Sequence, residues 1–246
     1  MLPTILAIET ATACCSVALS HQGELSERSL VGNNVHSQVL LEMVQDLLQL
    51  TAISVNDLDA VAVGQGPGSF TGLRIGVGVA QGIAYGADCP MIAVSSLDAL
   101  AIRAPSDGVV LAGIDARMGE VYWAEYIKNL NALERISALQ VSPPEDIAVN
   151  TCASTASPVA VQLVGNAWQE YKGQLSADLS QLSPNSEVEF PSASGLMSLA
   201  IQAFAQGKTI SAKEFAPEYV RNDVAKKTAK KAAKRATKQG TKKSAN

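Results

Sequence analysis

The chain has 246 residues, enough for one large domain or two small ones with a sizeable core. Hydrophobic residues make up 47% and charged residues 17%, a composition typical of soluble globular proteins. No apolar run reaches the ~20 residues that a membrane-spanning helix needs, and the N-terminus lacks the basic start of a signal peptide. We therefore expect a cytoplasmic protein without membrane contact, and its four cysteines, which form no Cys-x-x-Cys pair, are expected to be reduced.

The net charge of −4 conceals two parts of opposite sign. Residues 226–246 hold nine of the 19 Lys and Arg residues and no Asp or Glu. The preceding 225 residues carry the other ten basic residues and all 23 acidic ones, a formal charge of −13. An acidic body does not suit nucleic-acid binding, whereas the basic tail does. From Ala225 onward no apolar residue is larger than alanine, so we expect disorder or a transient helix there.

The first half of the chain predicts three strands followed by alternating helices and strands. Turn residues divide the first thirty residues into a β-meander. Apolar residues then recur at spacings of three and four, which predicts an amphipathic helix. The expected elements are strands at 4–10, 16–20, 25–30, 58–63 and 90–95, and helices at 35–50, 71–87 and 97–103. Thr71 and Ser96 are the predicted N-caps of the second and third helices.

The second half opens with a similar pattern. Strands are expected at 109–115, 120–127, 134–141 and 159–165, a proline-capped helix start at 142–147, and a helix at 194–206 that ends at Gly207. The order predicts an α/β fold with two similar lobes of the actin/hexokinase/Hsp70-like (ASKHA) type, each a mixed sheet with helices. We expect an N-terminal lobe at 1–105, a C-terminal lobe at 106–222 and a basic tail at 223–246.

The most distinctive stretch is the glycine-rich turn between the strand at 58–63 and the next helix. Gly66 and Gly68 flank Pro67 there. A turn of this kind presents N–H groups that can hold an anion or a phosphate, but a tight turn with close helix packing accounts for the same glycines. Further along the helix, glycines 78, 82 and 86 fall four apart on one face, where another backbone can come close.

The amino-acid sequence of this turn resembles a known family signature. The segment Gly66-Pro-Gly-Ser-Phe-Thr-Gly-Leu-Arg-Ile-Gly76 is similar to that of the bacterial TsaB (YeaZ) family, a partner in making threonylcarbamoyladenosine in tRNA. The resemblance covers roughly residues 4–223. It includes Ile8-Glu9-Thr10, Asp115-Ala-Arg-Met-Gly-Glu-Val-Tyr122 and Pro217-Glu-Tyr-Val-Arg221.

The resemblance implies a non-catalytic member of its fold. The sibling family TsaD is catalytic and holds a metal with a His-x-x-x-His motif, where this chain has Ser96 and Leu100. Leucine cannot ligate a metal, and the two histidines of the chain, His21 and His36, both precede the glycine turn. TsaD also carries Asp-Glu-Thr in its first turn, where this chain has Ala13-Cys-Cys15. We therefore expect no catalytic residue, no metal site and no cofactor.

The resemblance further implies a scaffold or activating subunit in the synthesis of N6-threonylcarbamoyladenosine at position 37 of tRNA. The expected partner is a TsaD-like catalytic subunit, which holds the metal and the threonylcarbamoyl-adenylate donor. A TsaE-like ATPase would join through the complex, and a homodimer would form in the absence of the catalytic partner. Contact with tRNA is expected to be indirect, either aided by the basic tail or with the tail solvated and unpartnered.

The first-lobe helices are the interface that the resemblance implies. The expected interface residues are Val39, Leu40, Met43, Val44, Leu47, Arg74, Gly78, Gly82 and Gly86. The apolar residues of the helix at 35–50 form two lines, so one can face the sheet and the other, with Leu40 and Val44, a partner. On that hypothesis, Leu40→Glu with Val44→Glu leaves a folded protein that no longer binds its partner.

The alternative function is that of a small-molecule kinase or ATPase of the same fold. Its nucleotide- or anion-binding residues would be Glu9, Thr10, Gly66, Gly68 and Ser69, around the glycine turn. Glu9 would be either an acid on the phosphate side or a partly buried carboxylate that caps the turn. Metallopeptidase activity is not expected, because the His-x-x-x-His motif is missing.

Overall fold

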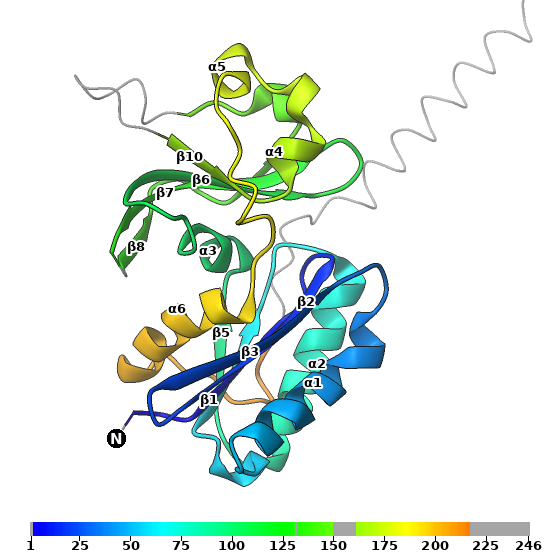
Figure 1. The fold of residues 1–246 in the computed structure, drawn as a ribbon, viewed down its shortest axis with the longest axis vertical. Coiled ribbons are helices and arrows are strands. Elements are labelled where there is room, and N and C mark those ends of the chain that lie inside the picture. Colours follow the sequence, from blue (N-terminus) through cyan, green and yellow to red (C-terminus); the bar gives the residue numbers. More distant parts are fainter. Residues whose placement is uncertain (1, 131, 150–160, 217–246) are drawn as a thin grey trace, which may run out of the picture.

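The computed structural model describes residues 2–130, 132–149 and 161–216, and these form two mixed sheets with helices packed against them (Figure 1). The first sheet has the order β3-β2-β1-β4-β5, and the second has the order β10-β6-β7-β8 with β9 also paired to β7. The α/β class and the two mixed sheets are as the sequence predicts. Within these residues, no helix has the length and apolar character needed to cross a membrane.

The strands are β1 Ile5–Glu9, β2 Cys14–His21, β3 Glu24–Val31, β4 Ala60–Gly64, β5 Met91–Val94, β6 Gly108–Asp115, β7 Val121–Asn129, β8 Ala132–Arg135, β9 Gln140–Ser142 and β10 Val161–Val164. The helices are α1 His36–Leu50, α2 Phe70–Gly86, α3 Ser96–Ala101, α4 Ala167–Glu170, α5 Ala177–Ser180 and α6 Ala193–Ala205, with 3-10 turns at Val55–Asp57, Pro144–Asp146 and Lys172–Gln174.

The first sheet is covered by helices on both faces. Strands β1, β2 and β3 form the predicted antiparallel meander, and β4 and β5 add to β1 in parallel. Side chains of β1 alternate between the two faces: Leu6 and Ile8 lie in the core under α1 and α2, and Ile5 and Ala7 in the core under α6. Both faces of the central strands are therefore dry, which explains their unbroken apolar sequence.

The two halves of the chain exchange helices. Helix α3 precedes β6 but packs against the second sheet, with Leu97 and Leu100 in its core. Helix α6 follows β10 but packs on the first sheet, beside β1, β2, β4 and β5 (Figure 1). Residues 193–216 therefore do not belong to a continuous C-terminal lobe at 106–222, because the second face of the first sheet needs α6 to cover it.

Local boundaries differ from the prediction in three places. The N-caps of α2 and α3 are Ser69 and Ser95, rather than Thr71 and Ser96. The hydroxyl of Ser69 accepts the N–H of Gly72, and that of Ser95 accepts the N–H of Asp98. The strand expected at 134–141 is divided into β8 and β9, which pair with different ends of β7. The helix start expected at 142–147 is a single 3-10 turn. The tail at 223–246 lies outside the described residues.

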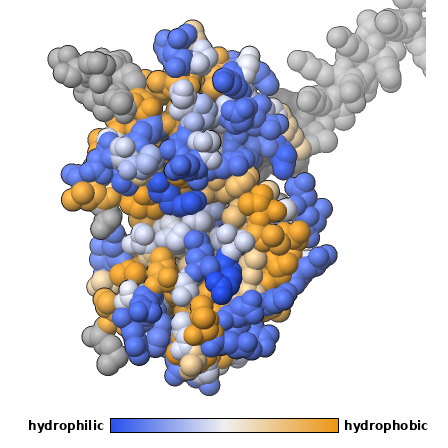
Figure 2. Space-filling view, viewed as in Figure 1, coloured by the Kyte–Doolittle hydropathy of each residue, from blue (hydrophilic) through white to orange (hydrophobic). Residues whose placement is uncertain are grey.

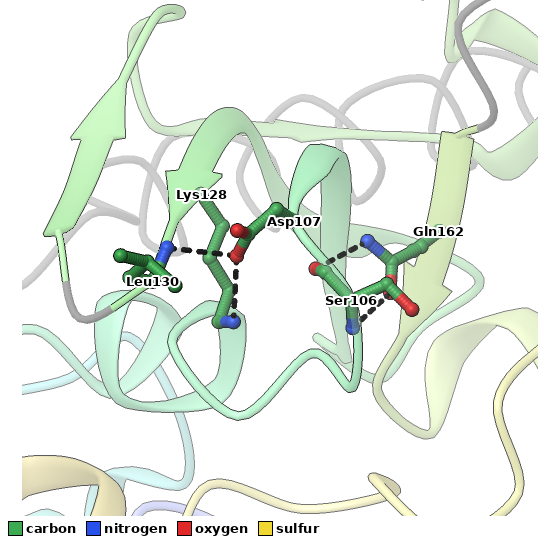
Figure 3. Close-up of polar contacts among 5 residues, drawn as sticks. All are labelled: Ser106, Asp107, Lys128, Leu130 and Gln162. Carbon is green, nitrogen blue, oxygen red and sulfur yellow. Dashed lines mark hydrogen bonds and ion pairs between the residues drawn. The ribbon is translucent and has the colours of Figure 1, made fainter.

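The connection from α3 to β6 is fixed to the second sheet (Figure 3). The side-chain amide of Gln162 donates to the carbonyl of Ser106 at 2.7 Å and accepts its N–H at 3.0 Å. The carboxylate of Asp107 accepts the N–H of Leu130 at 2.8 Å and pairs with Lys128 at 3.4 Å. The segment at the expected lobe boundary is thus held to β7 and β10 on both sides.

Candidate functional site

The glycine turn lies directly on the segment that follows β1. A Cβ at Gly72 would overlap the carbonyl oxygen of Thr10, one at Gly76 the hydroxyl of Thr10, and one at Gly68 the carbonyl oxygen of Ala11. The Thr10 hydroxyl donates to the carbonyl of Gly72 at 2.9 Å, and the N–H of Ser69 donates to Ala11 at 2.7 Å. These contacts support the interpretation of a tight turn with close packing. The N–H of Ser69 in particular is already used within the chain.

Glu9 joins three elements in the interior. Its side chain is fully buried, and its carboxylate accepts the N–H of Ala11 at 2.7 Å and the hydroxyl of Ser96 at 2.8 Å. A Cβ on Gly64 of β4 would overlap the same carboxylate. Burial raises the pKa of the Glu9 carboxyl above its ordinary value of 4.5, although its hydrogen bonds act to lower it. Glu9 therefore has the geometry of a structural carboxylate that ties β1 to β4 and α3.

Replacement of Glu9 by glutamine tests this role through pH. The folded chain holds the Glu9 proton to higher pH than the unfolded chain does, so the wild-type free energy of unfolding falls as pH rises from 4.5 through the raised pKa. Glu9→Gln has a similar shape but does not ionise. We expect the stability of Glu9→Gln relative to wild type to increase as the pH rises above about 4.5 in urea unfolding. Parallel curves for the two proteins would show that Glu9 is not buried in this way.

The site of the TsaD metal motif does not suit a metal in this chain. Ser96 and Leu100 lie one turn apart on α3, but the Ser96 hydroxyl donates to Glu9, and Leu100 is fully buried in the core of the second sheet. His21 bonds to the hydroxyl of Thr4, and His36 bonds to a backbone carbonyl. Within residues 2–130, 132–149 and 161–216, no three His, Cys, Asp or Glu side chains gather as a metal site would require.

A cavity of about 550 Å³ opens between the starts of α1 and α2 and the β6–β7 turn of the second sheet. Of the five residues proposed for nucleotide or anion binding, Gly68 and Ser69 line this cavity. Glu9, Thr10 and Gly66 do not, so the five do not form one ligand site. The Ser69 hydroxyl serves as the N-cap acceptor of α2.

Asp115 lines this cavity and bonds to several residues of the second half of the chain. Its carboxylate accepts the hydroxyl of Tyr171 at 2.7 Å and pairs with Arg117 at 3.2 Å, and its N–H donates to Asn166 at 3.1 Å. The sequence pairs Asp115 with Arg117, but it contains no signal for Tyr171, which is 56 residues away. The Arg117 side chain is 78% exposed, so this ion pair contributes at most about 1 kcal/mol to stability.

Three of the expected interface residues are not on the surface. Leu40, Val44 and Leu47 are buried in the core between α1, α2 and the first sheet. Val39 and Met43, on the other line, are partly buried at the edge of that core. The hypothesis assigned Leu40 and Val44 to a partner, but both are buried. Leu40→Glu with Val44→Glu would therefore place two charges in the core and unfold the protein instead of separating it from a partner.

The outward side of α2 carries five exposed residues in a line. We call Phe70, Arg74, Gly78, Gly82 and Gly86, which are spaced four apart and exposed, the α2 face. The guanidinium of Arg74 stacks on the ring of Phe70 at 3.7 Å. A Cβ on any of the three glycines would meet nothing within 4 Å. Figure 2 shows hydrophobic surface on the part of the molecule that holds α1 and α2. Among the residues that the structure describes, no element uses the close approach that these glycines permit.

Comparisons with known proteins agree with this fold. The chain is 43% identical over 227 residues to the tRNA threonylcarbamoyladenosine biosynthesis protein TsaB of Escherichia coli, a match that takes in 90% of this chain and 96% of that protein. It is 36% identical over 233 residues to the TsaB of Haemophilus influenzae, which covers 90% of this chain and 94% of the relative.

A solved structure and a family model also place the chain among proteins of this fold. YeaZ from Pseudomonas aeruginosa superimposes with a TM-score of 0.79 at 37% identity, over 89% of this chain and 100% of that one. Residues 31–245 match the family model of TsaD, described as tRNA N6-adenosine threonylcarbamoyltransferase. The fold is therefore of the ASKHA type, which TsaB and TsaD share. The high identity over nearly the full length of two TsaB proteins distinguishes this chain as a TsaB rather than a TsaD. The chain belongs to the TsaB (YeaZ) family of tRNA threonylcarbamoyladenosine biosynthesis proteins.

Proposed function

We propose that this protein serves tRNA threonylcarbamoyladenosine biosynthesis as a non-catalytic subunit that activates a TsaD-like catalytic partner. The role in this pathway follows from the family. The non-catalytic assignment rests on two residues of α3 that face the interior of the protein. Ser96 donates a hydrogen bond to Glu9, and Leu100 is buried. The resemblance to the catalytic sibling implies its two metal-binding histidines at these two positions. The chemistry, the metal and the donor then belong to the partner.

The α2 face is the surface that we assign to the partner. Each helical glycine costs about 0.5–1 kcal/mol relative to alanine, and no described residue packs where a Cβ of Gly78, Gly82 or Gly86 would lie. A helix of another subunit that packs along this line would come close to the backbone and offset that cost. Val39 and Met43 of α1 are partly buried against the core that α1 and α2 share. The buried Leu40, Val44 and Leu47 support the α2 face from beneath.

The same face would hold the chain in a homodimer when the catalytic subunit is absent. One surface cannot serve both partners at once, so the heterodimer replaces the homodimer. Size-exclusion chromatography with light scattering tests this assignment: the chain alone should elute as a dimer, and addition of the TsaD-like subunit should convert it to a mixed complex. Independent elution of the two proteins would contradict the proposal. A TsaE-like ATPase and tRNA would then meet the assembled complex.

The alternative, a kinase or ATPase of the same fold, predicts a different binding experiment. The glycine turn is packed on Thr10 and Ala11, and the N–H of Ser69 is already bonded, which does not favour a phosphate cradle. We expect titration of the isolated chain with ATP and magnesium in a calorimeter to give no tight binding, and incubation to give no turnover. Tight, magnesium-dependent binding with ATP hydrolysis would instead support the alternative.

A further inference from the structure

The turn between β6 and β7 has a backbone conformation that its own residues disfavour. Arg117 and Met118 have φ angles of +59° and +60°, and Gly119 follows at +75°. Two consecutive non-glycine residues in the left-handed region cost conformational free energy, and a turn that only reverses the chain favours glycine or asparagine there. Such outliers persist where the surrounding structure holds them, and they gather at binding sites. The strain therefore indicates a role for this turn beyond chain reversal.

Four hydrogen bonds hold the turn in this conformation. The Asp115 carboxylate accepts the N–H of Arg117 and the hydroxyl of Tyr171, each at 2.7 Å. The N–H of Ala116 donates to the carbonyl of Glu120 at 2.9 Å, and the N–H of Glu120 donates to the carbonyl of Arg117 at 3.2 Å. The turn is thus preorganised, which lowers the cost of ordering it when a partner binds.

The side chains at the cavity have the composition of a protein-binding surface. On the turn, Met118 is 81% exposed and the Arg117 side chain 78%. Arg117 and Phe70 line the cavity of about 550 Å³ from its two sides, and the guanidinium of Arg74 stacks on the Phe70 ring, which is 55% exposed. Aromatic residues, Met and Arg are the types enriched at protein interfaces. A small-molecule pocket keeps its apolar groups on its inner walls, whereas Phe70 and Met118 are more than half exposed.

We infer that the surface that binds the TsaD-like subunit continues from the α2 face across this cavity to the β6–β7 turn. A segment of that subunit enters the cavity, with an apolar side chain between Phe70 and Met118 and a carboxylate on Arg117. This inference rests on the proposed function, because Phe70 belongs both to the α2 face and to the cavity wall. Asp115, the ion-pair partner of Arg117, is 6% exposed, so the outward side of the guanidinium can bind a second carboxylate. The inserted segment would bridge the two sheets.

Met118→Ala tests the apolar contact, with Leu130→Ala as its matched control. Leu130 is also a turn residue with a positive φ, +52°, and it is 74% exposed (Figure 3). It follows the other end of β7, a nine-residue strand about 30 Å long. Isothermal titration with the TsaD-like subunit should show an affinity about tenfold lower for Met118→Ala and unchanged for Leu130→Ala, with wild-type melting temperatures for both. Met118→Leu, which keeps an apolar side chain of similar volume, should restore the affinity.

Two outcomes of this titration would overturn the inference. Wild-type affinity of Met118→Ala would show that the turn makes no contact with the subunit. Equal losses in Met118→Ala and Leu130→Ala would show an effect that has nothing to do with the cavity.

Arg117→Gln tests the carboxylate through the salt dependence of the same affinity. An ion pair in the complex makes the wild-type affinity fall as salt is added, because added ions screen the two charges. Arg117→Gln should lose part of this dependence, and Arg117→Glu should bind at least about tenfold more weakly than wild type. Arg28→Gln, at an exposed position of β3, is the control and should keep the wild-type salt dependence. Wild-type salt dependence of Arg117→Gln would refute the carboxylate.

A photo-crosslinking amino acid at position 118 identifies the occupant directly. In the assembled complex it should link to a peptide of the TsaD-like subunit that contains Asp or Glu, and the same probe at position 130 should not link to that subunit. A link from position 118 to a second copy of this chain, or no link to any protein, would overturn the inference.

Failure of the inference and failure of the proposed function give different results. If the wild-type chain does not associate with the TsaD-like subunit, the proposed function is refuted. If association is normal and is weakened by Gly82→Arg on the α2 face, but by neither Met118→Ala nor Arg117→Glu, the inference alone is refuted.

Discussion

Gly72→Ala is expected to lower the free energy of unfolding by about 1–3 kcal/mol, whereas Gly82→Ala on the same helix is expected to raise it by about 0.5–1 kcal/mol. The Cβ at residue 72 would overlap the carbonyl oxygen of Thr10, which is backbone and cannot move aside. The Cβ at residue 82 would meet no atom within 4 Å, so only the gain in helix propensity remains. Urea unfolding followed by circular dichroism measures both changes.

The pair of variants is its own control, because the chemical change and the helix are the same. Effects of equal sign at the two positions would contradict the account of the glycine turn, in which Gly68, Gly72 and Gly76 allow close packing within the chain, whereas Gly78, Gly82 and Gly86 are left for a partner. A destabilised Gly82→Ala would indicate that the α2 face is covered within the chain.

Gly82→Arg is expected to leave the fold intact and weaken association with the TsaD-like subunit by roughly 100-fold or more. The residue is exposed, so the long side chain finds space in the isolated chain. In the complex, the same side chain would hold the two helices apart or bury an unpaired charge, which costs about 3–5 kcal/mol. Isothermal titration with the purified partner gives the affinity, and the melting temperature reports on the fold.

Ser198→Arg is the matched control for this variant. Ser198 is an exposed position of α6, on the opposite face of the first sheet from α2 (Figure 1). The substitution adds the same side chain to a helix surface and should leave the affinity unchanged. Wild-type affinity of Gly82→Arg would exclude the α2 face as the partner surface. Equal losses in both variants would point to a general effect of added charge.

Local patterns in the sequence were sufficient for most of the fold. The meander, the amphipathic α1 and the strand–turn–helix around Gly68 all follow from spacings within about twenty residues. The N-cap of α2 was placed two residues late, because Ser69 and Thr71 are both good caps and the choice depends on where Ala11 meets the turn. The exchange of α3 and α6 between the sheets depends on which face each sheet leaves uncovered, and no local pattern reports that.

The orientation of α1 shows the same limit for the surface. Its apolar residues form a wide arc, and the periodicity identifies the arc without saying which edge faces the sheet. Because α2 also packs against α1, the core extends over Leu40, Val44 and Leu47 and leaves Val39 and Met43 at its edge. The sequence therefore identified the apolar residues of α1 but not which of them are accessible, and their part in an interface stays a prediction.

The candidate site was predicted in its residue types but not in its contacts. Ser96 was recognised as replacing a metal ligand, yet its bond to Glu9 joins residues 87 positions apart and could be seen only in the folded chain. The same holds for Tyr171 and Asp115. In both cases the partner is supplied by a separate strand or helix, and sequence spacing carries no information about it.

The most direct test of the central claim is a tRNA modification assay with a purified TsaD-like subunit, unmodified tRNA and the threonylcarbamoyl-adenylate donor. The account predicts little product from the catalytic subunit alone, full activity when the wild-type chain is added, no activation by Gly82→Arg, and no product from this chain alone. Product formed by this chain without the catalytic subunit, or full activation by Gly82→Arg, would contradict a non-catalytic subunit that acts through the α2 face.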